Sequence, residues 1–317
     1  MSFKISNITI SNKNEPLIVA EIGINHNGSL ERAINIADQA IKSGAKVIKH
    51  QTHIVDDEYS YHAKKIKPGN SNKNIYKIIK TCSLNEEDEF KLMNYIKKKN
   101  KVFISTPFSL KAVDRLIKFK VPAFKIGSGE CNNHILLEYI AKQKKPIILS
   151  TGMNDMVSVK KSVNIINKYH NKLAILHCTN VYPSSFDSLR LNSILDLKKE
   201  YKKNIIGYSD HSIGIYPSII AMSLGALIIE KHFVENKKFA KTCLWFMDPL
   251  VSYSDEMRRK TELVDYFCCD KKNVLSVAKE FNENSFHVCE GYDEDVDKPH
   301  ISEKQYDVSF IGNIYGD

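Results

Sequence analysis

Eight short apolar runs recur at near-regular spacing over the first 233 residues, and each of them ends in polar residues. Continuous apolar runs of this kind are typical of parallel strands that are buried on both faces. Eight units of strand and helix favour a TIM (β/α)8 barrel over an open doubly wound sheet, which would show fewer strands and a glycine-rich first turn. The runs are LIVAEIG, AKVIKHQ, KVFISTPF, AFKIGSG, PIILSTG, LAILHCT, IIGYSDH and LIIEKHF.

The segments between the runs have helical patterns. In residues 29–44, Ser29 is a candidate N-cap, Ala33, Ile36 and Ala37 begin an apolar stripe, and Gly44 ends the helix. The connection after the second run, roughly residues 52–84, is unusually long. Long connections on compact domains often cover a substrate, and we expect that role here.

Composition restricts the function classes. A chain of 317 residues has room for one large domain and a smaller appendage. The net charge of +9 comes from lysines scattered over predicted helix faces, with no basic stripe that carries interleaved aromatics, so no nucleic-acid partner is expected. The sequence shows neither an apolar run of membrane-spanning length nor a signal-peptide pattern, which predicts a cytoplasmic protein without a membrane partner. The seven cysteines contain no CxxC pair and are expected to be structural thiols.

Side chains at the carboxyl ends of barrel strands converge on one mouth, where TIM-barrel chemistry takes place. Two lysines at such positions, surrounded by hydroxyl and amide groups, suit a phosphate. A single serine or threonine there is as readily a strand-end cap, but the whole ring favours a site. The ring comprises Glu21, Lys49, Gln51, Ser105, Thr106, Lys125, Ser128, Glu130, Ser150, Thr151, His177, Thr179, Asn180, Ser209, Asp210, His211, Glu230, Lys231 and His232.

His211 and His232 end the seventh and eighth runs. Neighbouring strands lie about 4.8 Å apart, so the two imidazoles can share a divalent metal. Two protein nitrogens would leave coordination positions open for water or substrate, as in a catalytic site. His177 lies deeper in its run, and we interpret it as structural.

The combination of AEIGINHNG, KHQTH, PGNSNKNIY, FISTPF, KIGSGECNN, PIILSTGM, LHCTNVYP, GYSDHS and EKHF, over residues 16–233, resembles the NeuB-like N-acetylneuraminate (sialic acid) synthase family. That family includes the legionaminic and pseudaminic acid synthases. The resemblance implies a transferase that condenses phosphoenolpyruvate with the open-chain aldehyde of an N-acetylated hexose such as N-acetylmannosamine. The products would be a nine-carbon 2-keto sugar acid and phosphate, with Mn²⁺ or Mg²⁺ as cofactor and a homodimer as a possible assembly.

The resemblance also implies a role for each matching residue. Glu21 and Glu130 would be catalytic, together with the metal ligands His211 and His232. The sugar would be bound by Gln51, Asn70, Glu130 and Tyr182. Phosphoenolpyruvate would be bound by Lys49, Thr106, Lys125, Ser128, Ser150, Asn180 and Ser209.

The resemblance breaks off after His232. Residues 234–249 read VENKKFAKTCLWFMDP and lack the family's Gly-Pro-Asp element. Residues 237–317 do not resemble the antifreeze-like (SAF) domain that follows the family's barrel, and weakly resemble a fragment of a CgeB-like glycosyltransferase. We therefore expect a barrel over 1–236 and an atypical extension over 237–317, in which residues 255–267 would form a helix that covers the last strand.

Two alternatives remain open. A Schiff-base aldolase also uses a lysine at a barrel strand end, although it has no use for paired metal histidines. A catalytically weak or inactive barrel, as a relic or a product of fusion, would account for the altered segment after His232.

Overall fold

The computed structural model describes residues 2–67, 73–233, 243–246, 266–269 and 285–287. The chain divides into two compact units, Met1–Glu235 and Asn236–Asp317. Each unit is described by itself below.

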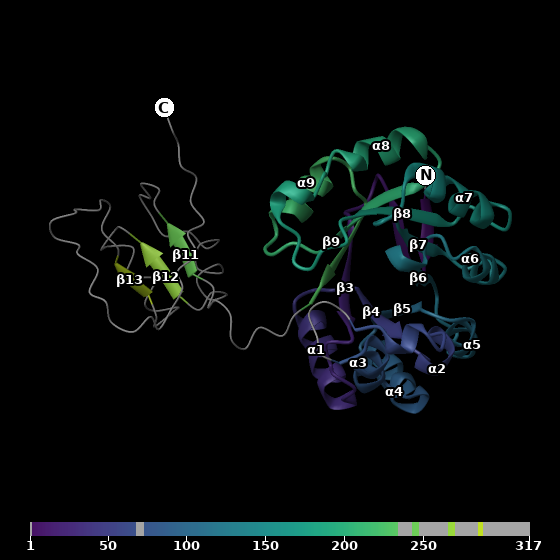
Figure 1. Cartoon of the computed structure of the whole chain (residues 1–317). Helices are drawn as coiled ribbons and strands as arrows, with labels where there is room; N and C mark the ends of the chain where they lie inside the picture. The colour runs from purple at the N-terminus through teal and green to yellow at the C-terminus, as the bar shows by residue number, and fades with distance from the viewer. Residues whose placement is uncertain (1, 68–72, 234–242, 247–265, 270–284, 288–317) are drawn as a thin grey trace. The chain divides into compact units, whose positions relative to one another are not determined.

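Unit 1 contains a closed barrel in which every neighbouring pair of strands is parallel (Figure 1). The predicted TIM barrel is therefore confirmed. Its strands follow the order of the sequence, and β10 closes the barrel against β3. The strands are β3 (Leu17–Gly23), β4 (Val47–Thr52), β5 (Val102–Pro107), β6 (Phe124–Ile126), β7 (Ile147–Ser150), β8 (Leu173–Cys178), β9 (Ile205–Asp210) and β10 (Ile228–His232).

Helices surround the strands, and side-chain caps fix where several of them begin. Ser29 Oγ accepts a hydrogen bond from Arg32 N at 3.2 Å, as predicted for the start of α1. Asn85, Ser109 and Asp155 cap α4, α5 and α7 in the same way. The helices are α1 (Leu30–Lys42), α2 (Val55–Glu58), α3 (Ile75–Cys82), α4 (Glu86–Lys98), α5 (Leu110–Lys118), α6 (His134–Ala141), α7 (Met156–Asn167), α8 (Ser193–Glu200) and α9 (Tyr216–Ser223), with short 3-10 turns η1 (Ala63–Lys65), η2 (Ser128–Glu130) and η3 (Phe186–Ser188).

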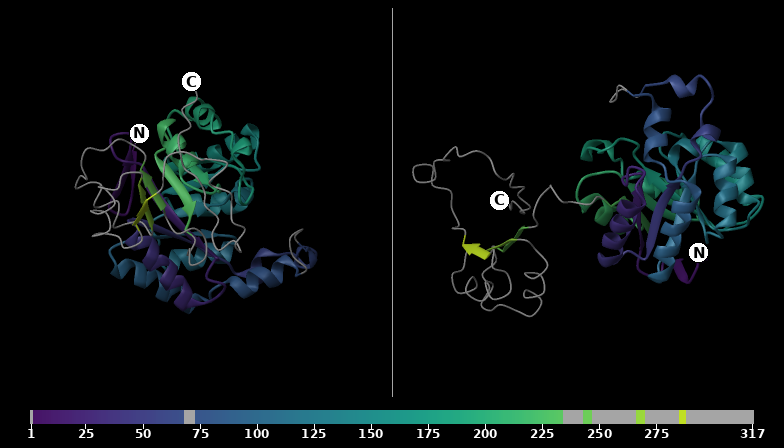
Figure 2. Two further views of the ribbon diagram at one scale, coloured as in Figure 1. Left: turned by 90° about the vertical axis from the view of Figure 1, so that its left-hand side faces the viewer. Right: turned by 90° about the horizontal axis from the view of Figure 1, so that it is seen from below.

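The long connection after β4 carries α2, η1 and α3. Figure 2 shows this segment, in blue, projecting from the body of the barrel. Residues 68–72, at its tip, lie outside the described part of the chain.

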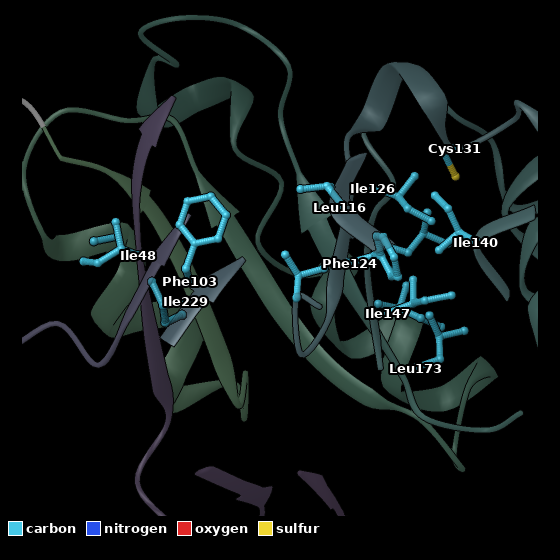
Figure 3. Close-up of a cluster of buried hydrophobic side chains, with 14 of the residues drawn as sticks. Ile48, Phe103, Leu116, Phe124, Ile126, Cys131, Ile140, Ile147, Leu173 and Ile229 are labelled. Atoms are coloured by element: carbon cyan, nitrogen blue, oxygen red, sulfur yellow. The ribbon is translucent and has the colours of Figure 1, made fainter. Parts of the chain in front are cut away.

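The main hydrophobic core lies between the strands and the surrounding helices (Figure 3). Ile48, Phe103, Phe124 and Ile229 point outward from their strands into this layer, where helix residues such as Leu116 pack against them. A second cluster fills the lower interior of the barrel and includes Leu17, Val19, Val47, Val102, Ile104, Ala123, Ile148, Ala174, Leu176, Ile205 and Ile228.

An antiparallel hairpin precedes the barrel and was not predicted from the sequence. It consists of β1 (Ser2–Ile5) and β2 (Ile8–Ser11). Ile5 and Ile10 are buried and belong to the cluster of the lower barrel interior. The hairpin therefore closes the amino-terminal end of the barrel, and the site must be sought at the opposite end.

Unit 2 contains a three-stranded parallel sheet of β11 (Cys243–Phe246), β12 (Tyr266–Cys269) and β13 (Ser285–His287). The helix predicted over 255–267 is wrong at its end, because Tyr266 and Phe267 belong to β12, and residues 255–265 lie outside the described part. The glycosyltransferase-like interpretation of 237–317 stays a prediction. Among the described helices of the chain, none combines the length and apolar character that crossing a bilayer requires.

Candidate active site

A cavity of about 210 Å³ opens at the carboxyl ends of the barrel strands. Its lining includes most of the residues predicted from the sequence, drawn from segments that are far apart along the chain. The lining residues are Lys49, Gln51, Thr106, Phe108, Lys125, Gly127, Ser128, Gly129, Ser150, Met153, Cys178, Asn180, Tyr182, Ser209, His211, Glu230 and His232.

The alternation of side chains along each strand explains why these residues meet. On β10, Ile228 belongs to the lower interior cluster, and Glu230 and His232 follow at intervals of two residues on the same face. Val47 and Lys49 are related in the same way on β4. The barrel interior is thus apolar near the hairpin and becomes polar toward the cavity.

Lys49 lies between two buried carboxylates. Its Nζ is 2.9 Å from Glu21 Oε2, 3.5 Å from Glu230 Oε1 and 3.4 Å from Thr106 Oγ1. Burial by itself would lower the pKa of Lys49, but the charges of Glu21 and Glu230 outweigh it and raise the pKa. Lys49 is therefore a permanent cation in the site.

Lys125 is also buried and has fewer ionic partners. Its Nζ donates to Ser150 Oγ at 2.8 Å and to the carbonyl oxygen of Ile126 at 3.0 Å, and it lies 3.6 Å from Glu230 Oε1. Burial lowers the pKa of Lys125, and the negative charge of Glu230 opposes that effect. Glu230 is thus the carboxylate that most favours the charged form of Lys125.

Glu230 is a functional candidate to which we assigned no role from the sequence. Burial would raise its pKa, but Lys125, Lys49 and a hydrogen bond from Ser209 Oγ at 2.9 Å lower it well below the usual range. The sequence contained a pattern that indicates this position for Glu230, because Glu230 precedes the candidate ligand His232 by two residues and must share its face of the strand. Glu230 Oε2 and Ser128 Oγ are buried and have no hydrogen-bond partner among the residues that the structure describes.

His211 and His232 lie together at the mouth, with ring centroids 5.8 Å apart. His211 Nδ1 faces the carbonyl oxygen of Thr179 at 2.8 Å, so Nδ1 carries the proton and Nε2 holds the lone pair with which the ring would bind a metal. The hydroxyl of Tyr182 lies 2.8 Å from this Nε2. Burial lowers the pKa of His211 to about 4, and it also lowers the pKa of His232, so both rings favour the neutral form that binds metals.

The two imidazoles fit a divalent cation that takes its other ligands from water or substrate. Within the described ranges, no group of three or more His, Cys, Asp or Glu side chains is arranged to hold a metal ion. A metal at this position, with His211 and His232 as its two protein ligands, stays a prediction.

Two residues to which the sequence assigned a role, Glu21 and Glu130, do not line the cavity, and a third is not described. Glu21 is behind the cavity wall and reaches the site through Lys49 and through Gln51 Nε2, which donates to Glu21 Oε1 at 2.9 Å. Glu130 does not line the cavity, and its Oε2 accepts a hydrogen bond from Asn133 Nδ2 at 2.7 Å. Asn70 lies outside the described residues.

Residues 36–249 match the model of the NeuB family. The chain belongs to the NeuB family. The match begins inside α1 and ends 13 residues beyond the barrel boundary expected at residue 236, so it includes β11.

Two curated relatives show how far the family likeness extends. An uncharacterized protein of Methanocaldococcus jannaschii is 40% identical over 228 residues, which are 71% of this chain and 64% of the relative. The N,N'-diacetyllegionaminic acid synthase of Campylobacter jejuni is 38% identical over 231 residues, 71% of this chain and 69% of the enzyme. The chain thus spans about two thirds of the length of these relatives.

A solved structure supports the same assignment. The N-acetylneuraminic acid (sialic acid) synthetase of Leptospira borgpetersenii, crystallised with citrate, superposes with a TM-score of 0.67 at 32% identity. The superposition covers 73% of this chain and 78% of the synthetase. The residues that line the cavity therefore belong to a NeuB-family barrel.

Proposed function

We propose that this NeuB-family chain condenses phosphoenolpyruvate with the open-chain aldehyde of an N-acetylated hexose, of which N-acetylmannosamine is an example. The products are a nine-carbon 2-keto sugar acid and inorganic phosphate. The observation that carries the proposal is the pair of buried lysines, Lys49 and Lys125, which share one small cavity with several hydroxyl groups. The synthase names of the Campylobacter and Leptospira relatives point to the same class of product.

Phosphoenolpyruvate carries a phosphate and a carboxylate, and the buried part of the cavity suits both. Lys49 and Lys125 supply positive charge, and Thr106, Ser150 and Ser209 supply hydroxyl groups beside them. Within the described part of the chain Ser128 Oγ has no hydrogen-bond partner, so it can donate to an anion oxygen. Burial strengthens each of these interactions because water does not compete in the cavity.

The sugar would lie nearer the mouth, where Gln51, Tyr182 and the two histidines are found. Tyr182 is 60% exposed, whereas Lys125 is 1% exposed, so the two ends of the cavity differ in their access to solvent. A Mn²⁺ or Mg²⁺ ion held by His211 and His232 would supply Lewis-acid polarisation of the aldehyde oxygen.

The proposed reaction forms one carbon–carbon bond. The methylene carbon of phosphoenolpyruvate attacks the aldehyde carbon, whose oxygen takes up a proton. Water adds to the cationic carbon that carries the phosphate and loses a proton. The tetrahedral intermediate then collapses to the ketone as its carbon–oxygen bond to phosphate breaks, and Lys49 and Lys125 stabilise the phosphate that leaves.

We assign to Glu21 the orientation of Lys49 and Gln51, because it contacts both side chains and does not itself line the cavity. The pKa of Glu230 is lowered strongly by two lysines, so its carboxylate is a poor base and serves as a counter-charge. Glu21 has one lysine partner in Lys49 and an amide partner in Gln51. Glu130 points away from this part of the site.

Phosphate release tests the proposal. The full chain is incubated with Mn²⁺, a panel of N-acetylated hexoses and phosphoenolpyruvate labelled with heavy oxygen in the bridging position. We expect release that requires a sugar and places the label in the phosphate, which identifies carbon–oxygen cleavage. Lys125→Met is expected to lose at least about 100-fold in kcat/KM for phosphoenolpyruvate, while Lys111→Met, at an exposed position on α5, keeps its activity.

Two results would count against the proposal. Label that stays out of the released phosphate would show cleavage of the phosphorus–oxygen bond and rule out the condensation, and no release with any sugar would favour the inactive barrel. A covalent adduct that borohydride traps with pyruvate would instead identify the Schiff-base aldolase. We further propose that the chain acts in the cytoplasm. We also propose that it forms a homodimer, and sedimentation of the full chain would test that assembly.

A further inference from the structure

A chain of hydrogen bonds leads into the site from the connection between β4 and α2. His53 Nδ1 lies 2.9 Å from Glu58 Oε2, and His53 Nε2 lies 3.3 Å from Gln51 Oε1. Gln51 in turn donates from Nε2 to Glu21 Oε1 at 2.9 Å. His53 and Glu58 do not line the cavity, and neither was assigned a role above.

The directions of these hydrogen bonds are fixed by the groups at each end. Glu21, as a carboxylate paired with Lys49, only accepts, so Gln51 must turn its NH₂ group toward it. Gln51 Oε1 then faces His53, whose Nε2 must donate to it, and because Nδ1 faces the acceptor Glu58 Oε2, the ring donates from both nitrogens. If the amide of Gln51 were reversed, its oxygen would face the oxygen of Glu21, and two acceptors would meet.

His53 is itself held firmly. Its ring stacks on Phe108, with centroids 4.2 Å apart and an angle of 11° between the ring planes. Glu58 accepts a hydrogen bond from the backbone N–H of Ile54 at 2.6 Å through Oε1, which leaves Oε2 for His53. The side chains of His53 and Glu58 are only 4% and 5% exposed. The donor that faces Gln51 therefore occupies a preorganised position.

We propose that His53 is a positioning residue that fixes the amide orientation of Gln51. With that orientation, one N–H of Gln51 Nε2 holds Glu21 and the other is left for the cavity, which Gln51 lines. Gln51 then presents a donor, not an acceptor, to the second substrate. This inference rests on the proposed function for the identity of that substrate, an N-acetylated hexose that offers an oxygen at this point.

Two substitutions of His53 separate the hydrogen bond from packing. His53→Gln keeps an N–H near the position of Nε2 but loses the stacking ring, whereas His53→Phe keeps the ring and loses the donor. We expect His53→Phe to lower kcat/KM for the sugar by about 10- to 100-fold, and His53→Gln to stay within about fivefold of the parent protein. Phosphoenolpyruvate affinity, measured by calorimetry, is expected to be unchanged in both variants because neither lysine is touched.

The reverse order, or equal losses in the two variants, would overturn the proposal. A second measurement does not depend on turnover. Nitrogen NMR of the imidazole, assigned to His53 by its loss in His53→Gln, is expected to show a protonated Nε2, and an unprotonated Nε2 would overturn the proposal. If the parent protein releases no phosphate with any sugar, the proposed function fails, and the NMR result still decides the role of His53.

Discussion

Glu230 Oε1 lies 3.6 Å from Lys125 Nζ, and both side chains are almost completely buried. The same oxygen is 3.5 Å from Lys49 Nζ and accepts from Ser209 Oγ. Together with Glu21, which pairs with Lys49 at 2.9 Å, this carboxylate balances the charges of the two buried lysines. The anion site that we propose for phosphoenolpyruvate is charge-balanced before any anion enters it.

Replacing Glu230 by Gln removes that balance. We expect a loss of stability on the order of 3 kcal/mol, because the charge of Lys125 is left without a carboxylate partner. Phosphoenolpyruvate should restore more of the thermal stability in the variant than in the parent protein, since the anion replaces the missing charge. Thermal unfolding with and without phosphoenolpyruvate measures both effects.

Glu138→Gln is the matched control for this experiment. Glu138 also pairs with a lysine, Lys142, but both side chains are about half exposed. Loss of the Glu138 charge should change stability far less than loss of the Glu230 charge, because solvent screens an exposed ion pair. A similar small effect in Glu230→Gln would mean that Lys125 does not depend on Glu230.

Removal of the metal provides a second prediction. Chelation is expected to abolish phosphate release, and added Mn²⁺ should restore it. Manganese bound per chain, measured by elemental analysis after dialysis, should fall at least about tenfold in His211→Ala and in His232→Ala, because each ring supplies half of the protein's ligands. His177→Ala is the comparison, since its Nε2 contacts the backbone carbonyl of Leu189 at 2.7 Å and not the cavity. Unchanged manganese binding in His211→Ala would rule out the site.

A third prediction concerns acid stability and the fully buried His26. Burial, with a smaller contribution from His50, lowers the pKa of His26 to about 3 from its ordinary value of 6.5. Gly28 N–H donates to His26 Nδ1 at 3.2 Å, and His26 Nε2 lies 3.2 Å from His50 Nε2. The neutral ring, protonated on Nε2, satisfies both contacts.

The sign of the pH effect follows from this lowered pKa. Between pH 6.5 and about 3 the unfolded chain binds a proton at His26 and the folded chain does not, so the stability that His26 contributes is present above pH 6.5 and is lost on acidification. From pH 6.5 to about 5 the loss amounts to about 2 kcal/mol. His26→Asn keeps an acceptor for Gly28 but does not titrate, so its stability should fall less over this range. Chemical denaturation of both proteins at several pH values checks this difference, and parallel curves would contradict it.

Gly207 on β9 gives a fourth prediction. A β-carbon added at this position would lie 2.4 Å from Leu176 Cδ2 and 2.5 Å from the carbonyl oxygen of Ile228, a backbone atom that cannot easily move. Gly207→Ala should therefore destabilise the barrel by about 1–3 kcal/mol. Gly129→Ala, whose nearest new contact would be Met153 Cε at 3.9 Å, should have little effect on unfolding. Equal midpoints for the two variants would contradict this account.

The barrel was predictable because the apolar run typical of a buried parallel strand occurs eight times, and this pattern depends on burial alone. The hairpin was not, because its two strands of four residues give only Phe3, Ile5, Ile8 and Ile10 as a pattern. Its burial depends on the lower interior of the barrel, which a local reading of the sequence does not reveal.

The site was predictable where residues lie on strands. Lys49 and His232 follow the two-residue alternation of β4 and β10, and the same rule would have identified Glu230. Glu130 lies in the turn η2 after β6 has ended, where alternation no longer fixes the direction of a side chain. His53 lies just beyond β4, and its role depends on Glu58 and Phe108, whose contacts with it exist only in the folded chain.

Among the described residues, the hairpin that carries Ile5 and Ile10 covers the amino-terminal end of the barrel, and the cavity opens at the carboxyl ends of the strands. For the proposed reaction, the ligand held by Lys125 and Ser150 must enter before the sugar is seated near Tyr182, because the sugar would block the path to them. The phosphate released at the inner end of the cavity can then dissociate only after the sugar acid has left. The hairpin at one end of the barrel thus imposes ordered kinetics on the reaction proposed for the other end. Phosphoenolpyruvate binds first, and phosphate is the last product to leave.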